Sequence, residues 1–375
     1  MRSRSPEGSA RWLISSIPLI FVLISCGERT TGLSAPFSGG QHPIQKSALS
    51  PSGTALSAQS CKGCHGAIYQ QWQGSQHGRS YTNPLYRHGF AEEPLAQCMN
   101  CHAPLWENKK AEFDKAYFYK SFDLPIVNEG VNCAVCHLRN DRIISGNPDS
   151  EKLNGCLLPL KYDAELKQTK FCANCHQFNF PAQSAPQVVH SSVPMQETVS
   201  EFKQTGWHTE GKSCQHCHFK RGNHNANSAH SSQDLKAALR FSGKYVESKD
   251  KTGSYLHAKI GFSSIGHHFP TGDLFHVLTL FVYDEDENAI AHHNFDKHVR
   301  VIDRKLLYDS RIHIKAGEKG SAADVWLTVP TRPVLCRVVL RLQGRIESRI
   351  QKHLTKEQLQ SVAYQGPCEA DQWAK

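Results

Sequence analysis

Five short segments of the chain repeat the pattern Cys-x-x-Cys-His, and together they hold ten of its 14 cysteines. Two thiols at this spacing can form thioether bonds to the vinyl groups of one porphyrin, and the histidine that follows can bind its iron. The candidate attachment cysteines are Cys61, Cys64, Cys98, Cys101, Cys133, Cys136, Cys172, Cys175, Cys214 and Cys217. The candidate proximal iron ligands are His65, His102, His137, His176 and His218. The pattern therefore predicts five covalently bound haem c groups.

Zinc sites and thioredoxin-like redox sites also contain Cys-x-x-Cys pairs, and they are the alternatives to exclude. The segments begin at residues 61, 98, 133, 172 and 214, so successive starts are 35–42 residues apart. Paired zinc knuckles stand closer together, and a zinc site would leave the regularly placed histidine without a role. A thioredoxin-like pair needs a βαβ context, which the sequence around these segments lacks.

One haem for about every 38 residues leaves too little polypeptide for a conventional hydrophobic core. We expect the porphyrins to supply much of the buried apolar surface and to pack closely enough for electrons to pass between them. The fold class predicted for this region is therefore mainly helical and irregular, with few strands and a haem-packed core. The same argument predicts that the chain does not fold without haem.

Each proximal histidine leaves one axial position on the iron. Histidine or methionine there closes the site for electron transfer, whereas water or an empty position lets the iron bind small molecules. Methionine is scarce, because Met1 lies in the N-terminal segment, Met99 lies inside an attachment segment, and only Met195 remains. Most distal ligands are therefore expected to be histidines.

Six further motifs lie among and after the attachment segments. They are Trp72-x-x-Ser75-x-His77, Gly130-Val131-Asn132-Cys133, Phe171-Cys172-Ala173-Asn174-Cys175-His176-Gln177, Met195-Gln196-Glu197-Thr198 followed by Glu201-Phe202, His224-x-x-x-x-x-His230 leading into Leu235, and Gly266-His267-His268-Phe269-Pro270-Thr271-Gly272. Over about residues 58–345 the chain resembles relatives of the tetrahaem cytochrome that accepts electrons from hydroxylamine oxidoreductase. Some of these relatives carry an appended β-domain.

The resemblance implies a set of distal iron ligands. The candidates are His77, His224, His230 and His267. The fifth distal ligand stays open among His88, His190, His208 and Met195. His216 lies within an attachment segment and is not expected to bind iron.

From Tyr255 onward the apolar residues follow a period of two, as in half-buried β-strands. Further strands are expected at 277–283, 299–303, 311–314, 325–329 and 334–342, and a helix is expected over Leu354–Ala363. We predict an all-β, antiparallel, sandwich-like domain whose edge reaches the haem region if His267 binds iron. The predicted division is a lipoprotein signal peptide at 1–25, a flexible tether at 26–57, a pentahaem cytochrome c domain at 58–240, a β-sandwich at 241–350, and a C-terminal helix and tail at 351–375.

The N-terminus has the pattern of an export signal, with a basic segment and an apolar run, Trp12–Ile24, that is too short to span a bilayer. The residues before Cys26 resemble the bacterial lipoprotein box, which implies that Cys26 is lipidated. An ordinary signal peptide with an incidental cysteine is the alternative. Gly27 favours the outer membrane by resemblance to enteric sorting rules, so we expect an exported protein on the periplasmic or cell-surface side.

Three cysteines remain outside the attachment segments and the lipoprotein box: Cys156, Cys336 and Cys368. An oxidising compartment favours one disulfide and one free thiol among them. Cys336 shares a strand face with apolar residues, which favours a buried free thiol there and a Cys156–Cys368 bridge. Connectivity does not follow from the sequence alone.

Three functions fit these features. The first is an electron carrier with six-coordinate haems, anchored to a membrane by its N-terminal lipid and serving redox partner proteins such as other cytochromes or a membrane electron-transfer complex. The second is a haem reductase or oxidoreductase of a small nitrogen or sulfur compound with one open haem, and the third is a module that docks a partner. No lysine replaces histidine in an attachment segment, and histidines are plentiful, so we favour the carrier. The net charge of +9 comes without a basic helix, so no nucleic-acid partner is expected.

Overall fold

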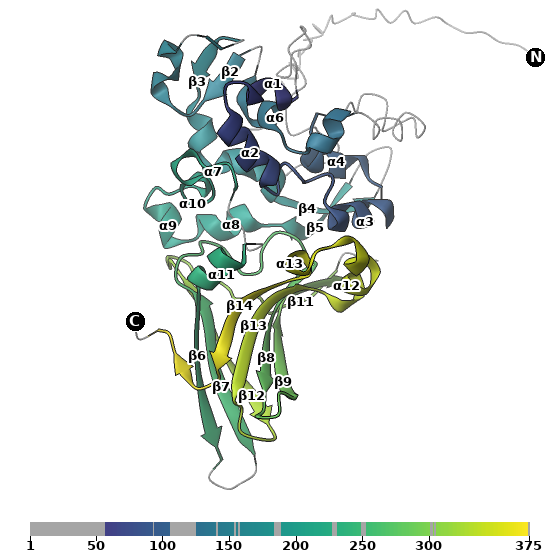
Figure 1. Ribbon diagram of the computed structural model, residues 1–375, viewed down its shortest axis with the longest axis vertical. Coiled ribbons are helices and arrows are strands. Elements are labelled where there is room, and N and C mark those ends of the chain that lie inside the picture. Colours follow the sequence, from purple (N-terminus) through teal and green to yellow (C-terminus); the bar gives the residue numbers. More distant parts are fainter. Residues whose placement is uncertain are drawn as a thin grey trace, which may run out of the picture. The chain divides into compact units, whose positions relative to one another are not determined.

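The computed structural model describes residues 57–373 except 93, 106–124, 140–141, 154, 157, 184–188, 227–230, 249–252, 301–302 and 304. A region of short helices and small sheets comes first, and a strand-rich region follows from Leu239 (Figure 1). The predicted order, a helical and irregular region followed by antiparallel sheets, is confirmed in general terms. The predicted signal peptide, the lipidation site Cys26, the tether before residue 57 and His230 lie outside the described residues.

The first region consists of short helices. They are α1 (Gln59–Lys62), α2 (Gly66–Gly74), α3 (Pro84–Glu92), α4 (Ala96–His102), α6 (Cys133–His137), α7 (Thr169–His176), α8 (Thr198–Lys203), α9 (Gly206–Thr209), α10 (Cys214–His218) and α11 (Ser232–Ala238). Helices this short are not stable alone in water and need tertiary contacts. No described helix is long and apolar enough to cross a membrane.

Two small sheets accompany these helices. One contains β1 (Leu138–Arg139), β2 (Arg142–Ser145) and β3 (Leu160–Tyr162), and the other pairs β4 (Phe178–Gln183) with β5 (Val189–Gln196). The described apolar core of this region is limited to two small clusters, one around Met99 and one around Val135. The polypeptide described here therefore contributes little core of its own.

The second region contains two four-stranded sheets. Their strand orders are β12-β7-β6-β15 and β14-β13-β8-β9, and every pairing is antiparallel. The strands are β6 (Leu239–Glu247), β7 (Ser254–Phe262), β8 (His276–Tyr283), β9 (Ala289–Phe295), β12 (Ser321–Val329), β13 (Leu335–Leu342), β14 (Gln360–Pro367) and β15 (Ala370–Asp371).

The alternation noted in the sequence explains how these sheets build a core. Leu256, Ala258, Ile260 and Phe262 all point to one face of β7, and each has no exposed surface. They join a single apolar cluster with residues from both sheets. The core that the first region lacks is therefore present here.

The strands predicted at 299–303 and 311–314 are correct only in part. The first is β10 (Lys297–Arg300), which forms a hairpin with β11 (Lys305–Asp309). Residues 311–314 form no strand and instead make isolated bridges to Phe269 and Ser321. The bridge to Phe269 attaches the Gly266–Gly272 turn, which lies between β7 and β8, to residues 311–314, and the bridge to Ser321 attaches these residues to β12.

The helix predicted over Leu354–Ala363 is wrong. Only α13 (Lys356–Leu359) forms there, after α12 (Gly344–Ile350), and the chain then continues as β14. Val362 and Tyr364 are residue types that favour strands, and β14 pairs with β13, which would otherwise have an open edge. The predicted C-terminal helix and tail therefore belong largely to the second sheet.

The predicted Cys156–Cys368 bridge is also wrong. Cys336 and Cys368 form the disulfide, with Cα atoms 4.8 Å apart, while Cys156 is an exposed free thiol. Strand β14 ends beside the start of β13, and the Cys368 N–H donates to the Val334 carbonyl over 3.0 Å. Strand pairing thus places Cys368 next to Cys336, which sequence spacing could not reveal.

Candidate functional site

Each attachment segment lies on a turn of helix. Cys98–His102 and Cys172–His176 end α4 and α7, whereas Cys133–His137 and Cys214–His218 make up α6 and α10. In the first segment, Cys61–His65, the His65 backbone N–H donates to the Cys61 carbonyl over 2.9 Å, so this segment also forms a helical turn. Positions i, i+3 and i+4 share one helix face, so both thiols and the imidazole face the same side, as attachment to one porphyrin requires.

Attachment cysteines from different segments lie close to one another. Cys61 raises the pKa of Cys133, Cys101 raises that of Cys175, and Cys214 raises that of Cys172, as neighbouring thiols do. Burial raises the pKa of Cys136 to about 11, and the nearby Cys175 contributes to the rise, so the third and fourth segments also adjoin. The fourth segment therefore lies beside the second, third and fifth, and the first lies beside the third.

Three proximal candidates each face a distal candidate. The ring centres are 6.3 Å apart for His176 and His77, 6.1 Å for His137 and His224, and 6.4 Å for His218 and His267. Two imidazoles on opposite sides of one metal ion have ring centres roughly 6.2 Å apart, because each metal–nitrogen bond is about 2.0 Å and each nitrogen lies about 1.1 Å from its ring centre. The spacing of these pairs fits an iron ion between the rings.

Hydrogen bonds set the tautomer of several of these histidines. Nδ1 lies within 2.7–2.9 Å of a backbone carbonyl in His102, His137, His224 and His267, the acceptors being Ser80, Ile144, Gly222 and His268. A carbonyl can only accept, so Nδ1 carries the proton and Nε2 keeps its lone pair for a metal.

Burial also keeps three of the candidate imidazoles uncharged. Desolvation lowers the pKa of His77, His102 and His267 to about 4, so each ring is neutral near pH 7. A neutral imidazole is the form that binds metal ions. The donor set is therefore suited to haem iron.

Two sequence motifs meet to hold His77. Gly130 has a φ of +59°, and a Cβ there would lie 2.6 Å from the His77 carbonyl oxygen, so only glycine fits without strain. The Val131 N–H donates to that same carbonyl over 3.0 Å, and the Trp72 indole N–H donates to the Val131 carbonyl over 2.8 Å. Asn132 then caps α6 by accepting from two backbone N–H groups. The motif before the third attachment segment therefore positions His77.

The other candidate ligands are not paired in this way by the described contacts. His65 is exposed, and the ring of His102 stacks on Tyr86 with centres 3.8 Å apart. His88 lies in α3, His190 in β5 and Met195 near the end of β5, while His208 lies in α9 beside Phe202. His216 caps α10 through its Nδ1, which accepts from the Ser213 N–H over 3.0 Å. The choice of the fifth distal ligand stays open.

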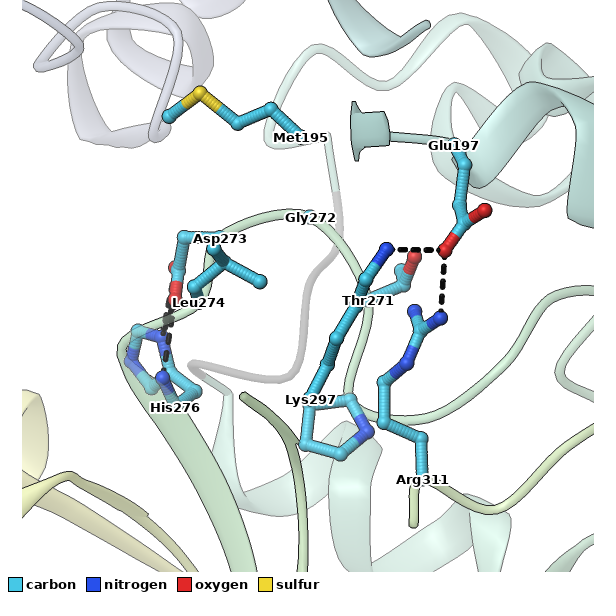
Figure 2. A pocket seen from close by; sticks show the side chains of 10 residues that line it. Met195, Glu197, Thr271, Gly272, Asp273, Leu274, His276, Lys297 and Arg311 are labelled. Carbon is cyan, nitrogen blue, oxygen red and sulfur yellow. Dashed lines mark hydrogen bonds and ion pairs between the residues drawn. The ribbon is translucent and has the colours of Figure 1, made fainter. Parts of the chain in front are cut away.

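A buried ionic cluster lies beside these sites, and no sequence pattern predicts it directly. We define it as Glu197, Glu201, Lys297, Asp309 and Arg311. The Arg311 guanidinium contacts all three carboxylates at 2.7–2.8 Å, and Lys297 contacts Glu197 at 2.6 Å. Figure 2 shows Lys297 and Arg311 converging on Glu197. Two of the carboxylates come from the Met195–Phe202 motif of the first region, and the cations come from the β region.

The ionic cluster borders a small pocket. The pocket is lined by Met195, residues 270–274, His276 and members of the ionic cluster (Figure 2). His276 donates from Nδ1 to the Asp273 carboxylate at 2.7 Å. Burial alone would lower the pKa of His276, but the charge and hydrogen bond of Asp273 outweigh it, so that the pKa is raised. This pair fixes the segment that leads from the Gly266–Gly272 turn into β8.

A family model and a solved structure are similar to this chain. The family model described as cytochrome c554 and c-prime matches residues 60–138. The fold is similar to that of a penta-haem cytochrome c552 from Thermochromatium tepidum, with 21% identity and a TM-score of 0.59 over 83% of this chain and 98% of that one. No curated protein matches the sequence. Together the two matches support a multihaem c-type cytochrome, while the relationship to the hydroxylamine oxidoreductase partner stays a prediction.

Proposed function

We propose that this multihaem c-type cytochrome binds five haems and transfers electrons between redox partner proteins. The observation that carries the proposal is the spacing of three histidine pairs, 6.1–6.4 Å between ring centres, in which one member always belongs to an attachment segment. Bound haem would supply one-electron chemistry at its iron. A ligand on each side of the iron favours electron transfer over the binding of a small substrate.

The ligand assignment follows from these pairs. His176 and His77 would hold one iron, His137 and His224 a second, and His218 and His267 a third. Backbone carbonyls orient the Nε2 atoms of His137, His224 and His267. His65 and His102 would be the proximal ligands of the remaining two haems, with His230 as the distal candidate that the family resemblance adds.

The proximity of attachment cysteines from different segments supports a branched path. The first segment adjoins the third, the third adjoins the fourth, and the fourth adjoins the second and fifth. Cys64 and Cys217, at the first and fifth segments, are exposed, whereas the other attachment cysteines are partly covered. Electrons would therefore enter and leave near the first and fifth segments and pass through the fourth.

The proposed location is outside the cytoplasm. The apolar run before Cys26 and the lipoprotein-like residues around it favour export and anchoring to the outer membrane by lipid. Attachment of haem c and the Cys336–Cys368 disulfide are both compatible with an oxidising compartment.

Mass spectrometry and low-temperature electron paramagnetic resonance (EPR) of the oxidised, purified protein test the function. We expect a mass gain of five haems and only low-spin ferric signals. His77→Ala should convert one haem of the five to high spin, whereas His353→Ala, a change at an exposed histidine, should leave the spectrum unchanged. A stoichiometric high-spin signal in the wild type would instead favour the reductase, and a mass gain of fewer than five haems would contradict the haem count.

A further inference from the structure

We infer that Glu201 is a positioning residue for His267, so that a carboxylate of the first region holds the axial ligand that the β region contributes to the fifth haem site. The inference rests on the proposed function, in which His218 and His267 bind one iron. His267 lies in the Gly266–Gly272 turn, and its ring centre is 6.4 Å from that of His218. The two ligands come from different regions, so a contact between the regions must set their separation.

Glu201 makes that contact directly. Its side chain is 2% exposed and lies in α8. One carboxylate oxygen, Oε2, accepts from the His268 N–H over 3.2 Å and from the Thr271 hydroxyl over 2.8 Å. The other, Oε1, accepts from Arg311 over 2.7 Å. A single buried carboxylate thus binds the turn at two residues, His268 and Thr271.

The turn is also held by hydrogen bonds from the β side. Phe269 exchanges two backbone hydrogen bonds with Ile312, at 2.8 and 3.0 Å. The His268 Nδ1 accepts from the Ile314 N–H over 3.1 Å. The His267 Nδ1 donates to the His268 carbonyl over 2.9 Å. These bonds hold the turn from the β side, and Glu201 holds it from the side of α8.

Glu201 is not the sole tie between the two regions. The Gly206 N–H donates to the Glu318 carbonyl over 2.9 Å, the Gly317 N–H donates to the Gln204 carbonyl over 2.8 Å, and the Trp207 indole donates to the Lys319 carbonyl over 2.7 Å. These bonds involve the loop before β12, and the Gly266–Gly272 turn makes none of them. Replacing Glu201 should therefore displace the turn without separating the regions.

The test uses EPR and redox titration of the intact haem-loaded protein. His267→Ala first identifies the signal of this site, because it should convert that haem to high spin. Glu201→Ala should shift the g-values or midpoint potential of the same haem, or convert part of it to high spin that added imidazole returns to low spin. Thr271→Val, which removes one hydroxyl without changing the volume much, should shift the same signal by less, and Thr271→Ser should restore it.

Lys297→Met is the matched control. It removes another buried charge of the ionic cluster, but Lys297 contacts Glu197 and the Pro194 carbonyl and not the turn. We expect it to lower stability without moving the signal that His267→Ala identifies. An equal shift in Lys297→Met would show a general structural effect and overturn the inference.

The two possible failures can be told apart. If His267→Ala leaves every signal unchanged, the ligand assignment fails and the inference fails with it. If His267→Ala acts as expected but Glu201→Ala and Thr271→Val both match the wild type, the ligand assignment stands and the positioning role is refuted. Should Glu201→Ala fail to fold, Thr271→Val is compared with Thr198→Val, which removes the Thr198–Thr271 hydrogen bond but leaves both bonds of Glu201 to the turn. An equal shift in these two variants refutes the positioning role.

Discussion

Replacing Arg311 by methionine tests whether the ionic cluster stabilises the fold. The Arg311 side chain is 6% exposed and contacts Glu201, Glu197 and Asp309, whose side chains are 2%, 23% and 16% exposed. Methionine fills a similar volume but leaves Glu201 without a cation. It leaves Asp309 with the contact to His313 and the bond from the backbone N–H of residue 311, each at 3.2 Å. Removing one partner of a buried ion pair lowers the free energy of unfolding by about 3–5 kcal/mol, because it leaves a desolvated charge without its counter-charge.

The pH dependence follows from the lowered pKa values of two carboxylates. Burial alone would raise the pKa of Asp309, but hydrogen bonds from Arg311 and His313 outweigh it and hold the pKa well below its ordinary value. Burial likewise opposes the net lowering of the Glu197 pKa, which Lys297 and Arg311 cause. A carboxylate with a lowered folded pKa stabilises the fold above its unfolded pKa of about 4, and this contribution is lost as the pH falls below that value. The loss of unfolding free energy in Arg311→Met should therefore be largest near pH 7 and shrink below about pH 4.

Thermal unfolding followed by far-ultraviolet circular dichroism measures this deficit. At about 2–4 °C per kcal/mol, the melting temperature should fall by roughly 6–20 °C at pH 7. Arg332→Met is the control, because the Arg332–Glu369 pair is 67% and 45% exposed and should contribute less than about 1 kcal/mol. A loss for Arg311→Met that equals the control, or one that does not shrink in acid, would refute the reasoning.

Three further outcomes are expected. Replacing both cysteines of the disulfide by alanine should cost about 3–4 kcal/mol in the loop-closure model, since 32 residues separate them, and chemical denaturation under oxidising conditions measures the loss. Cys156 is exposed, so a maleimide should label it in the native haem-loaded protein at a stoichiometry of one; resistance to labelling would show that it is covered. Gly130→Ala should displace the His77 carbonyl and alter one low-spin EPR signal, whereas Gly211→Ala, also at positive φ but with open space around its Cβ, should change no signal.

The features that the sequence predicts well are those with a short period. The attachment segments need only five consecutive residues, and the strand β7 shows its buried face in every second residue. The prediction of a C-terminal helix was wrong over most of its length. Lys356–Leu359 does form a turn of helix, as local propensity predicts, but from Gln360 onward the chain pairs with β13 as a strand. Local preference decides where no partner is available, and tertiary pairing overrides it where one is.

Features that depend on distant residues were beyond prediction from spacing. The resemblance supplied His77, His224 and His267 as ligand candidates, but it did not say which attachment segment each one faces. In the structure His77 faces the fourth attachment segment, where His176 lies 99 residues further along the chain. The predicted disulfide was wrong for the same reason, because the pairing of β13 with β14 places Cys368 beside Cys336.

The ionic cluster explains why two of the quoted motifs occur in one chain. Glu197 and Glu201 belong to the motif before the fifth attachment segment, and Thr271 belongs to the turn that carries His267. Buried carboxylates are unfavourable unless cations and hydrogen-bond donors compensate them, and here both the cations and the donors come from the β region. Each motif therefore has a physical requirement that only the other region meets. Since the ring paired with His218 lies on that same turn, the geometry of the fifth site depends on both regions together, and no single motif could specify it.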